Sequence, residues 1–395
     1  DLSKSTIYMS QGKYIMSEES GLGVIVRKDV KAIKGGYSQF SEGTDVSARD
    51  IDAYVTVISG DVNGNKQADA GDCGLLLVKK GHIAIEGVTF QYGYVSEADA
   101  SATECGSGIY VSGSASDTSI ELTDCVIRDC KSGVTTSAKQ GGPAVFVLSG
   151  QVRLNKVSLL DNTAAGRGGA VRCSSKTAVV FMNGCLLKGN SHNGSWGNGI
   201  QMSEGHICIN NTTLIENMGT GAALNGGGSI LLTNNTIIGN ANDSHGAVRC
   251  ETGVGGDTKF INNLLISENP SAPSFNLNGS NFEAFSKGYN VYQRVTGITM
   301  SASDTAYPNQ VNGALNEEGV YVWDLNQIGS VKGYATRQAV IEVAKSFNPV
   351  ASPITNLGEV FVEWIGEDAF GIDQRGVTRN ANKMQAGAYD AVLAN

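Results

Sequence analysis

Five oxygen-bearing side chains lie close together near the start of the chain, at positions 1, 3, 5, 9 and 12 of one short segment: Asp61, Asn63, Asn65, Asp69 and Asp72. Ca²⁺ prefers several oxygen ligands around a tight turn, and this is the spacing of a calcium-binding loop. However, Lys66 stands where such loops usually carry glycine, and Asp72 is shorter than the usual bidentate glutamate. The segment therefore predicts either a calcium site or a polar hairpin loop between two coils.

Two arginines occupy the same place in two copies of the pentapeptide Gly-Ala-Val-Arg-Cys. They are Arg172 and Arg249. A guanidinium binds a carboxylate through two parallel hydrogen bonds, so the pair is suited to an anionic sugar. Arginines are also common as solvated surface residues, and the sequence leaves that alternative open.

Histidines and a tryptophan gather in the segments between the predicted strands of neighbouring repeats, with two carboxylates near them: His192, Trp196, His206, Asp243, His245 and Glu251. An aromatic ring beside a histidine and a carboxylate is suited to a sugar platform or to acid–base chemistry. Ordinary loop composition is the alternative, because sequence alone does not show two carboxylates facing one substrate.

The composition excludes several classes of protein. With 29 basic against 38 acidic residues and a net charge of −9, the chain lacks the basic face of a nucleic-acid binder. Its apolar stretches, such as 75–78, are far shorter than the ~20 residues that span a bilayer, so we expect no transmembrane segment. The 51 glycines against 6 prolines predict many tight turns rather than a disordered linker.

One pattern recurs along the chain. Apolar residues alternate, a polar residue follows, and a second alternation ends in Asn in most copies. Seven such rows align without gaps and end 23 to 37 residues apart: 83–93, 120–130, 152–162, 180–190, 207–217, 230–240 and 259–269. Self-similarity at this period indicates a solenoid in which each row belongs to one coil.

Each row contains two short strands, because its apolar residues alternate on both sides of a polar corner such as Asn210. A third strand precedes most rows, in blocks such as 144–147 and 199–202. Three short strands per coil without a helical period predict an all-β fold, a single-stranded right-handed parallel β-helix with coils about 4.8 Å apart. Arg172 and Arg249 should then point outward on one face, three rows or about 14 Å apart.

Asparagines recur at two corners of the predicted coil. When stacked, they should form amide ladders that satisfy buried backbone groups. The first ladder would contain Asn162, Asn190, Asn217, Asn240 and Asn269, and the second Asn155, Asn183, Asn210 and Asn262.

Most of the eight cysteines also fit the repeat. Cys125 and Cys185 take the inward position that Val157 and Thr212 hold in other rows. We therefore expect buried free thiols that behave as small hydrophobic residues, rather than catalytic or disulfide-bonded cysteines. Cys208 is expected to point outward.

The two ends of the chain differ from its middle. We expect opening coils and a cap over 1–60, regular coils over 61–290 and an irregular C-terminal capping region over 291–395. Within the last region, 335–347 has apolar residues at helical spacing and predicts a short amphipathic helix on the end of the solenoid. Trp323 and Trp364 are expected to pack inside this cap.

The recurring Gly-[AGI]-[VI] block, followed by a strand that ends in x-x-Asn, resembles the GGA[ILV] and FxxN repeats of polymorphic outer-membrane proteins. The whole chain resembles secreted, pectate-lyase-like β-helix proteins of gut Bacteroidetes. Segments 56–61 and 85–90 are similar to the opening motifs of that group, and 370–376 and 387–390 to its closing motifs D-x-R-G and G-A-Y-E. The resemblance implies a β-helix at the outer cell surface or secreted, and no particular activity.

Two main functions remain open at this point. The first is a non-enzymatic secreted or surface protein, monomeric or trimeric, that binds polysaccharide or host-surface glycans through a face containing Arg172, Arg249, His245, Trp196 and His192. The second is a polysaccharide lyase or glycoside hydrolase acting on an acidic glycan. The paired acidic motifs of catalytic β-helix families are missing, so we name no catalytic residue. A purely architectural role in the envelope is a third alternative.

Overall fold

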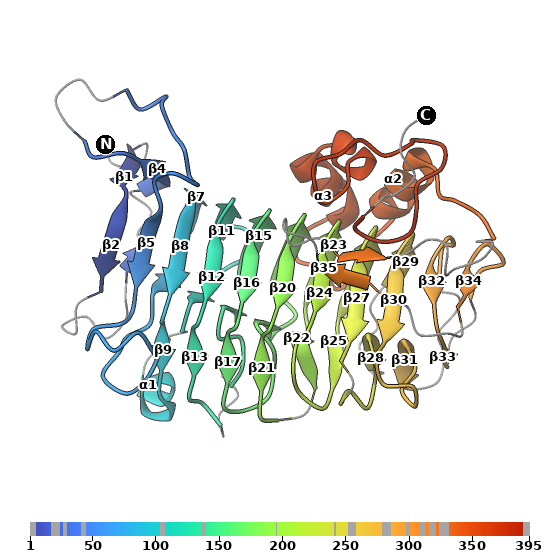
Figure 1. The fold of residues 1–395 in the computed structure, drawn as a ribbon, viewed down its shortest axis with the longest axis horizontal. Coiled ribbons are helices and arrows are strands. Elements are labelled where there is room, and N and C mark those ends of the chain that lie inside the picture. The colour runs from blue at the N-terminus through green and yellow to red at the C-terminus, as the bar shows by residue number, and fades with distance from the viewer. Residues whose placement is uncertain are drawn as a thin grey trace.

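Three long parallel β-sheets run side by side along the protein in the computed structural model (Figure 1). Each regular coil gives one strand to each sheet, and the same strands of neighbouring coils pair in parallel. This architecture confirms the predicted all-β parallel β-helix, and parallel crossovers of this kind are right-handed. The structure describes residues 5–16, 24–26, 30–40, 45–102, 107–135, 140–194, 196–240, 242–251, 258–278, 286–297, 300–307, 313–315, 321–323 and 332–389.

We name the three sheets A, B and C. Sheet A contains β1 (Ser5–Ser10), β4 (Val30–Tyr37), β7 (Gly81–Glu86), β11 (Thr118–Thr123), β15 (Gly150–Asn155), β19 (Ala178–Asn183), β23 (His206–Asn210), β26 (Ser229–Thr233) and β29 (Thr258–Ile261). Sheet B contains β2 (Gly12–Ile15), β5 (Thr56–Ser59), β8 (Val88–Gln91), β12 (Val126–Arg128), β16 (Ser158–Leu160), β20 (Leu186–Lys188), β24 (Thr213–Ile215), β27 (Thr236–Gly239), β30 (Leu264–Ser267), β32 (Val291–Tyr292) and β34 (Thr305–Ala306). Sheet C contains β3 (Val24–Val26), β6 (Leu76–Val78), β10 (Ile109–Val111), β14 (Val145–Val147), β18 (Val171–Cys173), β22 (Gly197–Met202), β25 (Ala222–Gly226), β28 (Val248–Glu251), β31 (Phe275–Asn278) and β33 (Val295–Thr296).

Smaller elements complete the coils. A short fourth parallel sheet, which the sequence did not predict, consists of β9 (Tyr94–Val95), β13 (Lys131–Ser132), β17 (Thr163–Ala164) and β21 (Ser191–His192). Helix α1 spans Glu97–Ala102, and β35 (Gly313–Leu315) pairs antiparallel with β36 (Tyr321–Trp323). Within the described residues, no helix is long and apolar enough to cross a membrane. Cys105, Asp390 and the side chain of Trp323 lie outside the described part.

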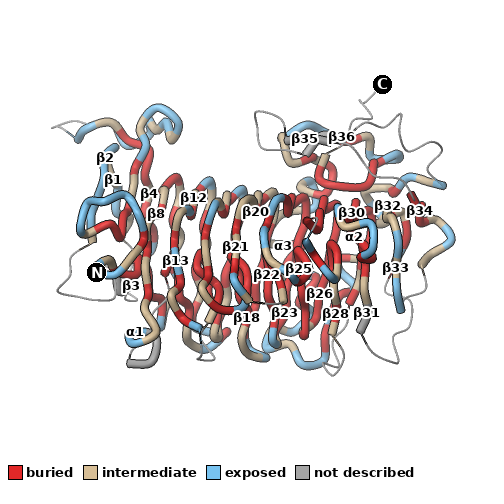
Figure 2. The backbone as a smooth tube through the Cα atoms, turned by 60° about the horizontal axis from the view of Figure 1, so that its bottom comes forward, coloured by how far each residue is buried: buried red, intermediate tan, exposed pale blue. Residues whose placement is uncertain are grey.

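The core is a set of apolar columns inside the coils, and the buried backbone runs continuously along the solenoid (Figure 2). In sheet A, Leu122, Leu154, Met182, Ile209 and Leu232 lie in register on successive strands. All of them are fully buried. Because the parallel register repeats from coil to coil, alternation within one strand becomes a column through the whole core.

The corner between sheets A and B explains why small and amide residues recur there. Its turn residue has a left-handed backbone in seven successive coils: Gly87, Asp124, Lys156, Gly184, Asn211, Asn234 and Asn262. Glycine, Asn and Asp enter this conformation most readily, so Lys156 is the exception.

Both predicted ladders exist, with changes at their C-terminal ends. Asn162 donates from its side-chain amide to Asn190, and Asn190 donates to Asn217, each over 2.9 Å. The side-chain ladder then changes: the amide of Asn240 donates to the backbone carbonyl of Asn217 and to the side chain of Asp243, and Asn269 donates to the backbone carbonyl of Asp243.

The second ladder contains the four predicted asparagines and gains Asn234 between Asn210 and Asn262. A third ladder was missed. It runs inside the coils from Asn235 through Asn263 to Asn290, at the inward position that Cys185 and Thr212 hold in earlier coils.

The C-terminal helices cover the side of the solenoid and not its end, which corrects the expectation for 335–347. Helix α2 spans Arg337–Lys345 and starts at Thr336, whose hydroxyl accepts a hydrogen bond from the backbone of Ala339. Helix α3 (Leu357–Ile365) was not predicted, and a 3₁₀ turn, η4, follows at Glu367–Gly371. These elements pack on the outer face of sheet A, where they bury Val179, Phe181, Cys208, Leu231 and Ile261. Cys208 therefore points outward from its coil, as expected, but is buried.

The closing motif of the chain clamps this cap to the coils. Asp373 accepts hydrogen bonds from the backbone and side chain of Arg375, whose guanidinium lies 3.9 Å from the centre of the Tyr389 ring. Arg379 donates to the side chain of Asn211 over 2.8 Å. Trp364 packs against Phe181 with ring centres 5.9 Å apart, which confirms its packing role. The D-x-R-G segment is therefore a structural clamp in this chain.

The seven described cysteines are free and buried, as predicted. Burial raises the thiol pKa to about 11 at Cys73 and to about 12 at Cys125, Cys130, Cys173, Cys185 and Cys250.

Since the thiolate is the reactive form, a Cys105→Ser variant should show no fast reaction with a thiol reagent at pH 8. In denaturant, all seven remaining cysteines of the same variant should react with the reagent. Rapid labelling of the native variant would contradict the buried positions of these cysteines.

Candidate functional site

The outer face of sheet C carries a column of polar side chains in register. Arg172, Gln201, Asn225 and Arg249 lie on four successive strands, from β18 to β28. Their neighbours along each strand, such as Val171 and Cys173, point into the core. The expectation that the two arginines share one face three coils apart is thus confirmed by the register.

The arginines are nevertheless not solvated. Arg172 is only 8% exposed, and its guanidinium lies 5.6 Å from the centre of the Phe146 ring. It donates to the backbone carbonyl of Gln140 and, over 3.4 Å, to the hydroxyl of Ser203. Burial, assisted by the charge of Arg167, lowers the pKa of Arg172 to about 10. The Arg249 side chain is 15% exposed and forms an ion pair with Glu251 at 3.5 Å.

Trp196 lies between two cations. The guanidiniums of Arg167 and Arg249 are each 5.6 Å from the centre of its ring. Arg167 comes from the preceding coil and Arg249 from a later one. The ring is therefore held by cation–π contacts and is not an open platform for a sugar.

The backbone of Trp196 is strained, with φ +106°. A bulky residue in this region is rare and persists only where its surroundings impose the conformation. Gly221 lies directly against it, and a Cβ at Gly221 would come 1.2 Å from the Trp196 carbonyl oxygen. The position of this indole therefore requires a strained backbone at Trp196. Backbone strain of this kind is found most often at binding and switch sites.

A small pocket opens beside these side chains. Its volume is about 220 Å³, and its lining includes Gln140, Arg172, Trp196, Gln201 and Glu251. Among the described residues, the buried Nε of Arg172, Nε1 of Trp196 and Nε of Arg249 have no hydrogen-bond partner. Buried donors without partners are rare in native proteins and call for an explanation such as a ligand.

His192 belongs to a different, fully internal chain of polar groups. Its Nε2 lies 2.8 Å from the side-chain oxygen of Asn198, whose amide donates to Asp243. Asp243 also accepts hydrogen bonds from the backbone and side chain of Asn240. Burial raises the pKa of Asp243 to about 8 and lowers that of His192. His192 is not among the residues that line the pocket.

The other two histidines also lie apart from the pocket. His245 pairs with Ser244 at 2.6 Å, and burial together with the charge of Arg249 lowers its pKa. His206 begins β23 in sheet A, where it is buried. The histidines of the sequence cluster are therefore dispersed.

The predicted calcium loop is a compact turn between β5 and β6, and the five predicted ligands are all in it. Their oxygens accept hydrogen bonds from within the protein, and Asp61 pairs with Lys13 at 2.8 Å. This hydrogen bond from Lys13 is the main cause that lowers the Asp61 pKa. In the described part of the chain, no three Asp, Glu, His or Cys side chains converge as a metal-ligand set. The oxygens of the other four predicted ligands are directed at N–H groups of the loop.

Several residues of the polar column and the pocket were missed from sequence. Gln201, which lines the pocket, and Asn225, which belongs to the column alone, occupy the third-strand position that Arg172 and Arg249 hold in their own blocks, so alignment of the blocks would have found them. Gln140 and Arg167 carry no such signal, because they come from connecting segments.

The pocket offers arginine and indole N–H donors, and among the described residues of its lining Glu251 is the one carboxylate. A glycoside hydrolase of the usual kind needs two carboxyl groups about 5–10 Å apart across the scissile bond. The described donors are suited to holding an acceptor-rich group.

The buried carboxyl of Asp243 predicts a specific pH dependence of stability. Its native pKa of about 8 exceeds the ordinary value of 3.8, so between these values the native protein keeps a proton that the unfolded chain releases. Stability should then fall as pH rises, by about 1.4 kcal/mol per unit, or roughly 2 kcal/mol from pH 6.5 to 8. The lowered pKa values of His192 and His245 act in the opposite direction, because near pH 6.5 the unfolded chain binds more protons at these residues than the native protein does, so a variant of Asp243 is needed to isolate its contribution.

Urea unfolding of wild type and Asp243→Asn at several pH values measures this term. The substitution should flatten the slope above pH 6.5, whereas Asp117→Asn, which alters an exposed carboxylate, should leave it in place. Parallel slopes in wild type and Asp243→Asn would show that Asp243 is ionised in the native protein.

Comparison with known families places these features in context. The family model described as "Right handed beta helix region" matches residues 53–265, which is more than half of the chain and includes the whole polar column of sheet C. Comparison with curated proteins and with solved structures gives no match. With its three parallel sheets and its repeating coils, the chain belongs to the right-handed β-helix family.

Proposed function

We propose that this protein is a secreted or cell-surface β-helix protein that binds acidic glycans without cleaving them, and that the pocket on the outer face of sheet C is its binding site. The observation that carries the proposal is the set of buried donors without partners on Arg172 and Trp196, which line the pocket, and on Arg249, which packs against Trp196. An unmade hydrogen bond at a buried group costs about 1–3 kcal/mol, and more at a charged group. A ligand that accepts these hydrogen bonds removes that cost.

The chemistry of the donors selects the class of ligand. Two guanidiniums and an indole N–H favour an anionic acceptor, and a carboxylate fits the planar guanidinium best. The pocket of about 220 Å³ is smaller than sites for drug-sized ligands, which are about 300–1,000 Å³. It suits one sugar residue of a longer chain.

Binding to immobilised polysaccharides tests the proposal. Wild type should be retained on polygalacturonate, alginate or hyaluronan, and not on a neutral glucan, with retention that weakens as salt rises. Arg172→Met and Arg249→Met should each reduce affinity about tenfold or more, because each removes a charged hydrogen bond. Trp196→Phe keeps the ring and removes only the indole N–H, so it should cause a smaller loss.

Arg128→Met is the matched control. Arg128 lies at the end of β12 in sheet B, away from sheet C, and its guanidinium donates to the side chain of Gln91 on the neighbouring strand β8. Equal losses in this variant, or equal retention on neutral and acidic glycans, would contradict a specific site on sheet C.

One observation supports a second function, a polysaccharide lyase. The lowered pKa of Arg172, about 10, brings this residue closer to use as a general base. A lyase of this kind would release unsaturated ends from an acidic glycan, faster toward pH 10, and Arg172→Met would abolish the release. We expect binding without new reducing or unsaturated ends between pH 7 and 10. If wild type releases new ends from the glycan and Arg172→Met does not, the protein is a lyase and the proposal of binding without cleavage is wrong.

A further inference from the structure

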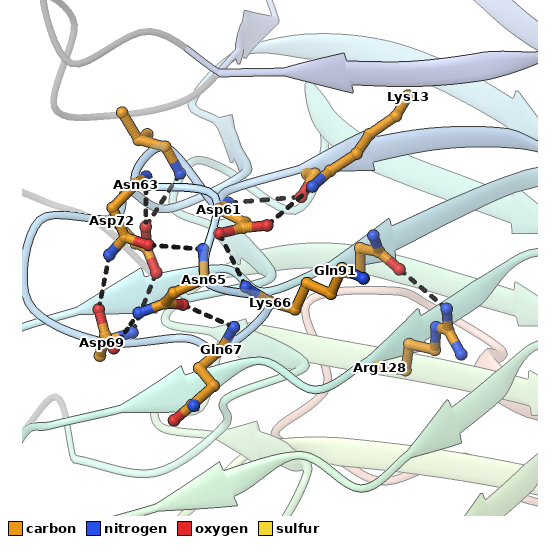
Figure 3. A network of polar contacts seen from close by, with 12 residues as sticks. Lys13, Asp61, Asn63, Asn65, Lys66, Gln67, Asp69, Asp72, Gln91 and Arg128 are labelled. Carbon is orange, nitrogen blue, oxygen red and sulfur yellow. Dashed lines mark hydrogen bonds and ion pairs between the residues drawn. The ribbon is translucent and has the colours of Figure 1, made fainter.

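We propose that Lys13 takes the place of a metal ion in the loop 61–72 and thereby holds the first coil of the solenoid against this loop. The loop has the ligand spacing of a calcium site, but the cation that pairs with its Asp61 is the ammonium group of Lys13, from another coil (Figure 3). Its shape therefore does not depend on calcium.

Asp61 shows the substitution most directly. Its side chain is 0% exposed, and its Oδ2 accepts a hydrogen bond from Lys13 Nζ over 2.8 Å. Its Oδ1 accepts from the backbone N–H of Lys66 over 3.2 Å. A buried carboxylate needs a counter-charge and hydrogen bonds, and Asp61 obtains both without a metal.

The other two carboxylates of the loop are also satisfied internally. Asp72 accepts from the backbone N–H of Val62 over 2.9 Å and of Asp69 over 3.1 Å, one at each oxygen. Asp69 accepts from the side-chain amides of Asn63 and Asn65 over 2.9 and 2.7 Å. Each carboxylate oxygen of the loop thus already has a donor.

The asparagines face the wrong way for a cation. Asn63 and Asn65 turn their amide NH₂ groups toward Asp69, while their side-chain oxygens accept from the backbone N–H groups of Asn65 and Gln67 over 2.9 Å. A Ca²⁺ ion needs these oxygens directed at a common centre. The hydrogen bonds of the loop instead close on themselves.

The position of Lys13 makes the ion pair a tie between coils. Lys13 lies in β2, the outermost strand of sheet B, which pairs only with β5 and whose four residues are all exposed. An edge strand with little buried surface has few other contacts that hold it in place. The ion pair to a fully buried carboxylate is therefore a main side-chain contact between this strand and the loop.

Thermal unfolding in calcium and in chelator tests the inference. For wild type, the Tm in 5 mM CaCl₂ and in EGTA should agree within about 1 °C, since no metal site is present. Lys13→Met keeps the aliphatic stem and removes the charge, and it should lower Tm by about 2–4 °C. The double variant Lys13→Met/Asp61→Asn should recover most of this loss, because the neutral amide needs no cation.

Lys34→Met is the matched control. Lys34 is exposed to a similar extent, 33% against 36% for Lys13, but its partner Glu86 keeps a second ion pair with Arg49 at 3.0 Å. This variant should leave Tm within about 1 °C of wild type.

Two outcomes would overturn the inference. Calcium binding to wild type at about one equivalent, seen by calorimetry or as a rise in Tm, would show that the loop is a metal site. A Lys13→Met variant as stable as wild type, or one that Asp61→Asn does not rescue, would show that the ammonium does not serve Asp61. If Lys13→Met does not fold, recovery of folding in the double variant decides the same question.

Discussion

The parallel backbone pairing between successive coils is the constraint on which the rest of the structure depends. It fixes each residue above its counterpart in the coil before, so any feature of one coil is repeated or answered by the next. The apolar columns, the asparagine ladders and the polar column of sheet C all follow from this register. The insertion or deletion of one residue inside a strand would move the side chains that follow it in that strand to the opposite face.

The repeating coils do not by themselves cover the outer faces of the sheets or the two ends of the solenoid. On the outer face of sheet A, apolar residues such as Phe181 and Leu231 are covered by α2 and α3, which pair with no strand and follow no repeat. The clamp of Asp373, Arg375 and Arg379 fixes the chain that leads from these helices back to the coils. At the other end of the solenoid, all four residues of β2 are exposed, and the ion pair of Lys13 with the buried Asp61 ties this strand to the loop.

The repeating features were predictable from sequence, and the singular ones were not. Alternation and period revealed the coils, the inward cysteines and two ladders, because each appears many times in a local pattern. The third ladder had a visible signal in the doubled asparagines Asn234-Asn235 and Asn262-Asn263, of which one member points out and the other in. The burial of Arg172 depends on Gln140, which comes from a connecting segment, and no local pattern reports such a contact.

The polar column of sheet C brings the register and the proposed function together. Register alone would place two exposed arginines there, as the repeated pentapeptide predicted. The connecting segments instead bury them against Phe146 and Trp196 and leave donors unpaired, at a cost that the fold does not need for its own stability. The strained backbone of Trp196 adds to that cost. The unpaired donors and the strained backbone of Trp196 occur together at one small pocket, and the ligand that we propose would account for both by accepting these hydrogen bonds.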